Sequence, residues 1–331
     1  MSSIELPEAP AIPGLRFRSI QRPADDAAIA VLMNECAAAD EVPSRETAAQ
    51  ITLWLDHPSG FDPELDLVFA EVDGSVVAYG QAGWEQDNDG GENYEVYGNV
   101  HPAWRRRGLG SALMRWAEAR QRSLAASHPR AAERRLESWS YDSETGRRAL
   151  LEANGYEMVR YWFEMDRPHL DQLPAVSLPD GVELRPARPE DVRGVWELEV
   201  EAFRDHWGST DESEASFERR RDNPLNDLSL WIVAWHGDEI VGEVVNRINV
   251  PENEELGLQR GWLGSVAVRR TWRHRGIAKA MVAASLRVFR DAGMTSAGLG
   301  VDAENPHGAV GIYESAGFQI SERGRVYRKP F

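Results

Sequence analysis

The sequence predicts an α/β fold made of two successive copies of one unit, each a mixed β-sheet with helices on both faces. The chain has 331 residues, which is enough for two domains with separate cores. A basic, glycine-containing turn between a strand and a helix occurs twice, and Val100 to Gly110 aligns without gaps with Val268 to Ala278. The order of expected strands and helices around this turn also repeats, which indicates an internal duplication.

The composition is that of a globular protein with an acidic balance. Apolar residues make up 42% of the chain and charged residues 27%, and the formal net charge is -17. Because phosphate contacts need a basic surface, we expect no nucleic-acid partner. The start of the chain lacks the pattern of a signal peptide, and no apolar run reaches membrane-spanning length. We therefore expect a cytoplasmic protein without a membrane partner.

Cysteine and histidine usage excludes two kinds of site at this stage. The single cysteine, Cys36, lies in an apolar helical run, so no intrachain disulfide can form and a buried structural thiol is expected. The histidines are scattered and show no metal-ligand spacing. We therefore expect no metal site.

The first half begins with a proline-rich segment, residues 1–13, which predicts a flexible leader. A helix is expected over Ser44–Leu55 with Ser44 as its N-cap, and a hairpin around Asp73-Gly74. The other expected elements are strands at Gly14–Ile20, Asn93–Val100, Leu136–Tyr141 and Met158–Asp166, and helices after Pro23, after the basic turn and at Gly146–Ala153.

The second half repeats this order after a proline-containing connection, Arg167–Pro179. Its expected elements are strands at Gly181–Arg185, Trp231–Trp235, Ile240–Val245, Trp262–Val268 and Gly298–Val301, a helix from Pro189, a helix at Ala309–Ala316, and a last strand from Phe318. The domain boundaries that follow are 1–170 for the N-terminal domain and 180–331 for the C-terminal domain.

The repeated turn has the features of an anion-binding loop. In the second copy, Arg273 to Ala278 fits Arg-x-x-Gly-x-Ala, and Ile277 and Met281 begin one face of the helix that follows. Free N–H groups and the positive end of the helix dipole favour an anion there. Gly276 and Ala278 carry little or no side chain, so a pyrophosphate could approach the backbone.

Each half resembles the GNAT N-acetyltransferases, which bind acetyl-coenzyme A and acylate an amine. In that family a loop of this pattern holds the pyrophosphate, and the preceding, splayed strand binds the pantetheine arm. The resemblance implies acetyl-coenzyme A as cosubstrate, coenzyme A as product and a small-molecule amine as acceptor. The coenzyme-binding residues it implies are Val266, Ala267, Val268, Arg273, His274, Arg275, Gly276, Ile277, Ala278, Lys279 and Asn305 in the second half, and Val100, Arg105, Arg106, Arg107, Gly108, Leu109 and Gly110 in the first.

A second motif of the family runs from Asn305 to Phe318 in the pattern Asn-x-x-x-Ala-x-x-x-Tyr-x-x-x-Gly-Phe. By resemblance, Tyr313 protonates the departing thiolate, and Asn305 contacts the coenzyme. A phenol with its ordinary pKa of ~10 is protonated at neutral pH and can donate. In the first half Ser143 and Leu151 stand at these positions. We therefore expect a degenerate N-terminal domain and catalysis in the C-terminal domain.

The general base is less evident, because the second-half strand starts Gly261-Trp262-Leu263-Gly264 without a carboxylate. Glu243 on the expected hairpin and His206 after the first helix are the candidates, and an unassisted base acting through water is a third possibility. The predicted reaction is acetyl transfer to the primary amine of an aminoglycoside-like, amino-acid-like or thiol-precursor molecule. The alternative is a non-catalytic acyl-coenzyme A sensing module. A monomer or a homodimer is expected.

Overall fold

The computed structural model describes residues 3–6, 8–129, 133–173, 175 and 177–331. Its contacts divide the chain into two compact units. The first unit comprises residues 1–160 and 325–331, and the second comprises residues 161–324. The α/β class with mixed sheets and helices on both faces is confirmed in each unit.

The first unit holds strands β1 to β6 in sequential order, followed by the end of the C-terminal strand β13. From β1 to β6 neighbouring strands are antiparallel, except that β5 and β6 are parallel. The strands are β1 (Ser3–Ile4), β2 (Leu15–Arg18), β3 (Leu67–Val72), β4 (Ser75–Gln86), β5 (Glu92–Val100), β6 (Arg134–Tyr141) and β13 (Gln319–Pro330). The helices are α1 (Ala24–Ala39), α2 (Ala48–Asp56), α3 (Leu109–Ala125) and α4 (Thr145–Ala153).

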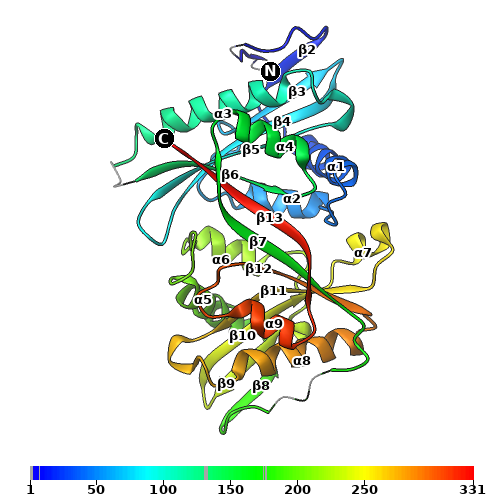
Figure 1. Ribbon diagram of the computed structural model, residues 1–331, viewed down its shortest axis with the longest axis vertical. Coiled ribbons are helices and arrows are strands. Elements are labelled where there is room, and N and C mark those ends of the chain that lie inside the picture. The colour runs from blue at the N-terminus through cyan, green and yellow to red at the C-terminus, as the bar shows by residue number, and fades with distance from the viewer. Residues whose placement is uncertain (1–2, 7, 130–132, 174, 176) are drawn as a thin grey trace. The chain divides into compact units, whose positions relative to one another are not determined.

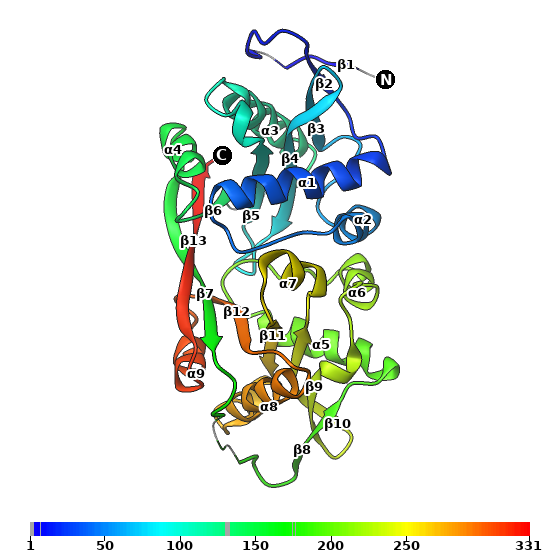
Figure 2. The same cartoon turned by 90° about the vertical axis from the view of Figure 1, so that its right-hand side faces the viewer.

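Alternation along β3 shows how both faces of the first sheet are covered. Leu67 and Phe69 pack with α1 and α2, whereas Val68 and Ala70 pack against α3. Figure 2 shows α1 and α3 on opposite sides of strands β4 and β5. The period-two burial places an apolar core on each side of the sheet.

The second unit has the strand order β7-β12-β11-β10-β9-β8. Its strands are β7 (Glu157–Pro168), β8 (Val182–Pro186), β9 (Ile232–His236), β10 (Glu239–Arg247), β11 (Arg260–Val268) and β12 (Ser296–Asp302). Its helices are α5 (Val192–Phe203), α6 (Glu214–Arg221), α7 (Val250–Leu256), α8 (Ile277–Asp291) and α9 (Ala309–Ser315). Helix α8 runs across β9, β10 and β11, as Figure 1 shows, and α5 packs on β10 and β11.

The parallel strand pair of each unit separates before its first strand ends. In the second unit β11 pairs with β12 only as far as Leu263, although β11 continues to Val268. In the first unit β5 pairs with β6 only as far as Glu95 and continues to Val100. The two separation points lie 168 residues apart, the same offset as the repeated turn. In the second unit, the backbone of β11 beyond Leu263 therefore has no β12 partner on this side.

Each unit completes its core with a strand from one end of its own sequence range. Tyr327, near the end of β13, is fully buried among Tyr94, Leu136 and Leu151 of the first unit. Met165 of β7 is fully buried in the second-unit core. The first unit is therefore closed by the last seven residues of the chain.

Two details differ from the sequence predictions. Helix α2 begins at Ala48, and its N-cap is Thr47, not Ser44. Thr47 and Gln50 form a reciprocal capping box, which satisfies two helix-end donors and fixes the start there. The expected flexible leader is instead ordered where the structure describes it, since Ser3–Ile4 pairs with β2 and Leu6 is buried.

Across the described residues, no helix combines the length and the apolar character that crossing a bilayer would require.

Candidate functional site

The second-unit loop between β11 and α8 has a defined, partly left-handed backbone. A short 3₁₀ turn, Arg270–Trp272, precedes it, and His274 and Gly276 have φ values of 61° and 83°. Helix α8 starts at Ile277, so its first N–H groups have no intrahelical acceptor. Among the described residues, nothing lies within 4 Å of the position that a Cβ on Gly276 would take. The loop therefore presents open space at the positive end of a helix.

Arg273 ties this loop to the body of the second unit. Its Nε donates to the Val268 carbonyl at 3.2 Å, and its Nη2 donates to the Ala202 carbonyl at 2.8 Å. Its Nη1 lies 2.6 Å from Asp205 Oδ2. Burial acts to raise the pKa of Asp205, but the hydrogen bond and charge of Arg273 outweigh it and lower this pKa to about 2. The guanidinium thus positions the loop.

A cavity of about 470 Å³ lies between this loop, the separated part of β11 and the start of α9. It brings together most of the second-half residues predicted from the sequence. Those that line it are Val266, Ala267, Val268, Arg273, His274, Gly276, Ile277, Ala278, Lys279, Asn305, Tyr313 and His206. Arg275 is not among its lining residues, and its guanidinium lies over the Trp272 ring at 4.6 Å.

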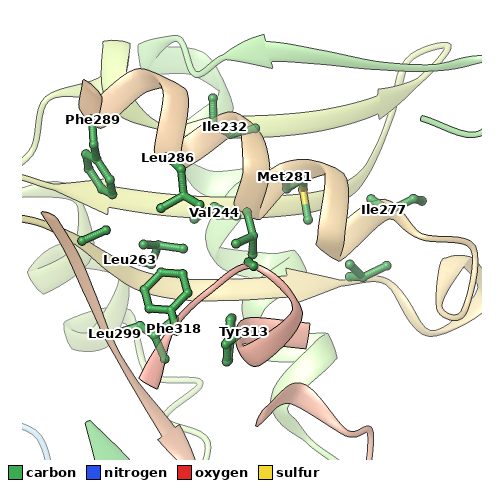
Figure 3. Close-up of a cluster of buried hydrophobic side chains, with 14 of the residues drawn as sticks. Ile232, Val244, Leu263, Ile277, Met281, Leu286, Phe289, Leu299, Tyr313 and Phe318 are labelled. Atoms are coloured by element: carbon green, nitrogen blue, oxygen red, sulfur yellow. The ribbon is translucent and has the colours of Figure 1, made fainter. Parts of the chain in front are cut away.

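Tyr313 lies on α9 and is 7% exposed. Its ring packs with Phe318 in the apolar cluster that α8 forms with the sheet (Figure 3). No hydrogen-bond partner of its hydroxyl is found within the described part of the chain. Burial, and secondarily the charge of Glu243, raises the pKa of Tyr313. The phenol therefore stays protonated at neutral pH at the wall of the cavity.

Asn305 holds the turn that leads into α9. Its Oδ1 accepts from the backbone N–H of His307 at 2.9 Å and of Ala309 at 3.4 Å. This is the side-chain-to-backbone pattern typical of asparagine before a helix. The contacts explain why the motif places an asparagine eight residues before Tyr313.

Glu243 lies on β10, is 1% exposed, and does not line the cavity. Ser265 Oγ donates to its Oε2 at 3.2 Å, and its Oε1 has no partner in the described residues. Burial, reinforced by the charge of Glu199, raises the pKa of Glu243 to about 8. A carboxyl group with this pKa can accept a proton near neutral pH.

His206 lines the cavity and forms part of a cluster that the sequence analysis missed. The nearest ligand atoms of Asp205, His206 and His307 all lie within 4.8 Å of one another, a spacing that could hold a metal ion. The two histidines are far apart in the sequence, so no local spacing revealed the cluster. Arg273 Nη1 lies 2.9 Å from His307 Nε2, and its positive charge opposes a cation there. The absence of a metal remains a prediction.

The first unit repeats the loop geometry. Arg106 and Gly108 have φ values of 61° and 88°, and Arg105 Nη1 lies 2.6 Å from Asp40 Oδ1. Its cavity, about 430 Å³, is lined by Val100, Arg105, Arg106, Gly108 and Gly110 from the predicted set, whereas Arg107 and Leu109 do not line it.

The first unit lacks both groups proposed for proton transfer. Strand register pairs Tyr79 with Asn99 and Glu243 with Ala267, and Asn99 matches Ala267 at the offset of 168. Tyr79 therefore stands where the second unit has Glu243. Leu151, which is 1% exposed, stands where the second unit has Tyr313. The first unit therefore has no carboxyl group at the position of Glu243 and no phenol at the position of Tyr313.

Comparison with known protein families gives one family match in each unit. The Acetyltransferase (GNAT) family matches residues 192–318, and the Acetyltransferase (GNAT) domain matches residues 64–158. A mycothiol acetyltransferase of Streptomyces scabiei is 30% identical over 76% of this chain and 76% of its own length.

Two solved structures share the fold over nearly the whole chain. A GCN5-related N-acetyltransferase from Sphaerobacter thermophilus has a TM-score of 0.71 and 30% identity, covering 98% of this chain and 97% of its own. A tandem GNAT protein from the clavulanic acid biosynthesis pathway has a TM-score of 0.66 and 20% identity, covering 96% and 98%. With a loop, a separated strand pair and a family match in each unit, this chain belongs to the GNAT acetyltransferases as a tandem member.

Proposed function

We propose that the second unit transfers an acetyl group from acetyl-coenzyme A to the primary amine of a small molecule. The observation that carries the proposal is that one cavity is lined by the open loop at Gly276, the unpaired end of β11 and Tyr313. An acetyl-coenzyme A site needs three things from the protein: a place that binds the pyrophosphate, backbone groups that pair with the amides of the pantetheine arm, and a proton donor for the thiolate.

The coenzyme would contact two parts of this cavity. Its pyrophosphate would lie on the N–H groups at the start of α8, with the Lys279 ammonium group at the cavity wall as a counter-charge. Its pantetheine arm would pair with the backbone of Val266 and Val268, beyond the point where β12 leaves β11. A backbone N–H of this stretch could then stabilise the oxyanion of the tetrahedral intermediate.

In the proposed reaction the amine nitrogen attacks the thioester carbonyl and forms a C–N bond. The proton lost by nitrogen passes to the base, the C–S bond breaks, and the thiolate takes a proton from the Tyr313 hydroxyl. Glu243 is the first candidate base, because its raised pKa of about 8 matches the task, and since it does not line the cavity the proton would reach it through water. His206 remains the second candidate, since it lines the cavity, although burial lowers its pKa.

The acceptor is proposed only as a class. A thiol-precursor amine is supported by relatives that carry the name mycothiol acetyltransferase. Aminoglycoside-like and amino-acid-like amines remain alternatives. A cytoplasmic location and a monomeric or homodimeric state also remain predictions.

The competing proposal is a non-catalytic acyl-coenzyme A sensing module. A disulfide reagent that reports released thiol, applied with acetyl-coenzyme A across a panel of small amines, separates the two. For panel members that themselves bear a thiol, the acetylated product is quantified by mass spectrometry instead. Amine-dependent turnover supports the enzyme. Tight coenzyme binding without turnover for any amine class would favour the sensor.

A further inference from the structure

Arg147, on α4 of the first unit, reaches the unpaired end of β5. Its Nη1 donates to the Gly98 carbonyl at 3.0 Å, and its Nη2 donates to Asn99 Oδ1 at 2.9 Å. Its Nε donates to Glu144 Oε1 at 2.9 Å, and its guanidinium lies over the Tyr97 ring at 4.3 Å. The side chain is 15% exposed. Arg147 is therefore fixed from three sides at the edge of this strand.

The second unit has an alanine where the first has Arg147. Helices α4 and α9 both end before a left-handed glycine, Gly155 and Gly317, with φ values of 81° and 89°. These glycines lie 162 residues apart, so Arg147 corresponds to Ala309. Ala309 lines the second-unit cavity and has no side chain that could reach β11. The edge of β11 is thus left open and the edge of β5 is not.

The contact to Gly98 matters because of its place on the strand. Gly98 lies beyond Glu95, where β6 has left β5, and it corresponds to Val266 at the offset of 168. A coenzyme arm that pairs with this strand needs its carbonyl groups as acceptors. In the first unit the guanidinium already donates to this carbonyl. Releasing Arg147 would leave Glu144, which is 7% exposed, without its cation.

A second, independent contact covers the loop of the first unit. A Cβ placed on Gly108 would lie 3.3 Å from Pro10 Cβ, whereas one placed on Gly276 meets nothing within 4 Å among the described residues. Arg115 of α3 forms an ion pair with Glu8 at 3.2 Å. The segment before β2 thus brings the Pro10 ring against the loop at Gly108, and Glu8 anchors this segment to α3 through Arg115.

We propose that Arg147 takes the place of the pantetheine arm in the first unit, so that the first-unit cavity excludes acyl-coenzyme A and the chain binds one coenzyme molecule. The cavity of about 430 Å³ is the space that remains around Arg147. This proposal rests on the function proposed for the second unit. In this proposal the first unit has a structural role, and Arg147 of the same unit supplies the hydrogen bond to the free edge of β5.

The test is the stoichiometry of acetyl-coenzyme A binding to the full chain, measured by isothermal titration calorimetry. We expect one equivalent for the wild type and none for Gly276→Glu, in which a carboxylate enters the second-unit loop. Two equivalents for the wild type, with one lost in Gly276→Glu, would overturn the closure of the first unit and leave the proposed function intact. One equivalent that survives in Gly276→Glu would contradict both.

Arg147→Ala tests whether this side chain is the obstruction. We expect this variant to bind a second equivalent of acetyl-coenzyme A, more weakly than the first. Arg147→Lys keeps a cation near the strand, so we expect it to bind one equivalent, as the wild type does. Circular dichroism melting establishes that each protein is folded before titration. A folded Arg147→Ala protein that still binds one equivalent would remove Arg147 from the explanation. If this variant does not fold, the stoichiometry of the wild type still tests whether the first-unit cavity excludes acetyl-coenzyme A.

Discussion

Arg273 and Asp205 form an ion pair in the second unit, with Nη1 2.6 Å from Oδ2. Arg105 and Asp40 form the same pair in the first unit at 2.6 Å. In both units the arginine Nε also donates to the last carbonyl of the preceding strand. Because the pair persists in the unit that has no counterpart of Glu243 or Tyr313, its role is to hold the loop.

Asp205→Asn should therefore weaken coenzyme binding more than it slows the chemical step. The change removes one charged partner of a charge-assisted hydrogen bond, so KM for acetyl-coenzyme A should rise on the order of ten-fold with a small change in kcat. Steady-state kinetics at a fixed amine concentration measures both. The matched change Asp40→Asn should leave KM unchanged. An equal rise in both variants would refute a role specific to the second loop.

Gly276→Glu should abolish turnover, because it brings a carboxylate to the proposed pyrophosphate position. Gly108→Glu is the matched control, since Gly108 has nearly the same left-handed φ, 88° against 83°. Both variants carry the same backbone strain and the same charge. Thiol release by folded protein should persist in the Gly108 variant. Loss of turnover in the Gly108 variant alone would reverse the assignment of the two units.

Tyr313→Phe should lower kcat by a factor on the order of 10²–10⁴, as for loss of a positioned acid. The hydroxyl has no hydrogen-bond partner within the described residues, so its removal should change the free energy of unfolding by less than about 1 kcal/mol. Turnover at saturating acetyl-coenzyme A and the thermal midpoint are measured together. An unchanged kcat in a well-folded variant would leave Tyr313 with a packing role only.

The proposed role of Glu243 as the base leads to a prediction for the pH dependence of the reaction. As a base it acts when ionised, so kcat/KM should rise with pH and level off above about 8, the raised pKa of Glu243. Since the pKa of Tyr313 is raised, the acid should not limit the rate at that pH. Glu243→Gln should remove this rise. A wild-type profile that levels off below pH 6.5 would instead favour His206, whose pKa burial lowers.

The raised pKa of Glu243 also predicts how the stability of the folded protein changes with pH. The folded pKa of this carboxyl group, about 8, exceeds the unfolded value of ~4.3, so the folded state holds a proton that the unfolded state has lost. Its contribution to stability is present below pH ~4 and is lost as pH rises towards about 8. Denaturant titrations at several pH values should show a smaller fall over this range in Glu243→Gln than in the wild type.

Chelation should leave turnover unchanged. Asp205, His206 and His307 have a spacing that could hold a metal ion, but Arg273 already supplies a positive charge to two of them. Turnover after exhaustive dialysis against a strong chelator should equal that of untreated protein. A rate that falls on dialysis and returns with one added divalent ion would show that the cluster is a metal site.

The duplication and the loop were predictable because they depend on local patterns. The spacing of Gly108 and Gly276 within a strand-turn-helix pattern determines their left-handed backbone, and the sequence carries that spacing directly. The role of Arg147 was not predictable, since it depends on how far α4 lies from the unpaired end of β5. The burial of Glu243 and the meeting of His206 with His307 likewise arise from tertiary packing.

The burial of Tyr327 in the first unit has a consequence for how the chain is made. A ribosome completes residues 1–160 early, but the strand that carries Tyr327, Arg328 and Lys329 is synthesised only after residues 161–324 of the second unit. Tyr327 donates to Glu152, and Arg328 pairs with Glu137, so these two carboxylates cannot form these contacts until the second unit has been synthesised. The nascent first unit must therefore keep an open sheet edge while the second unit is synthesised, and the half that is translated first cannot finish folding until the other half has been made.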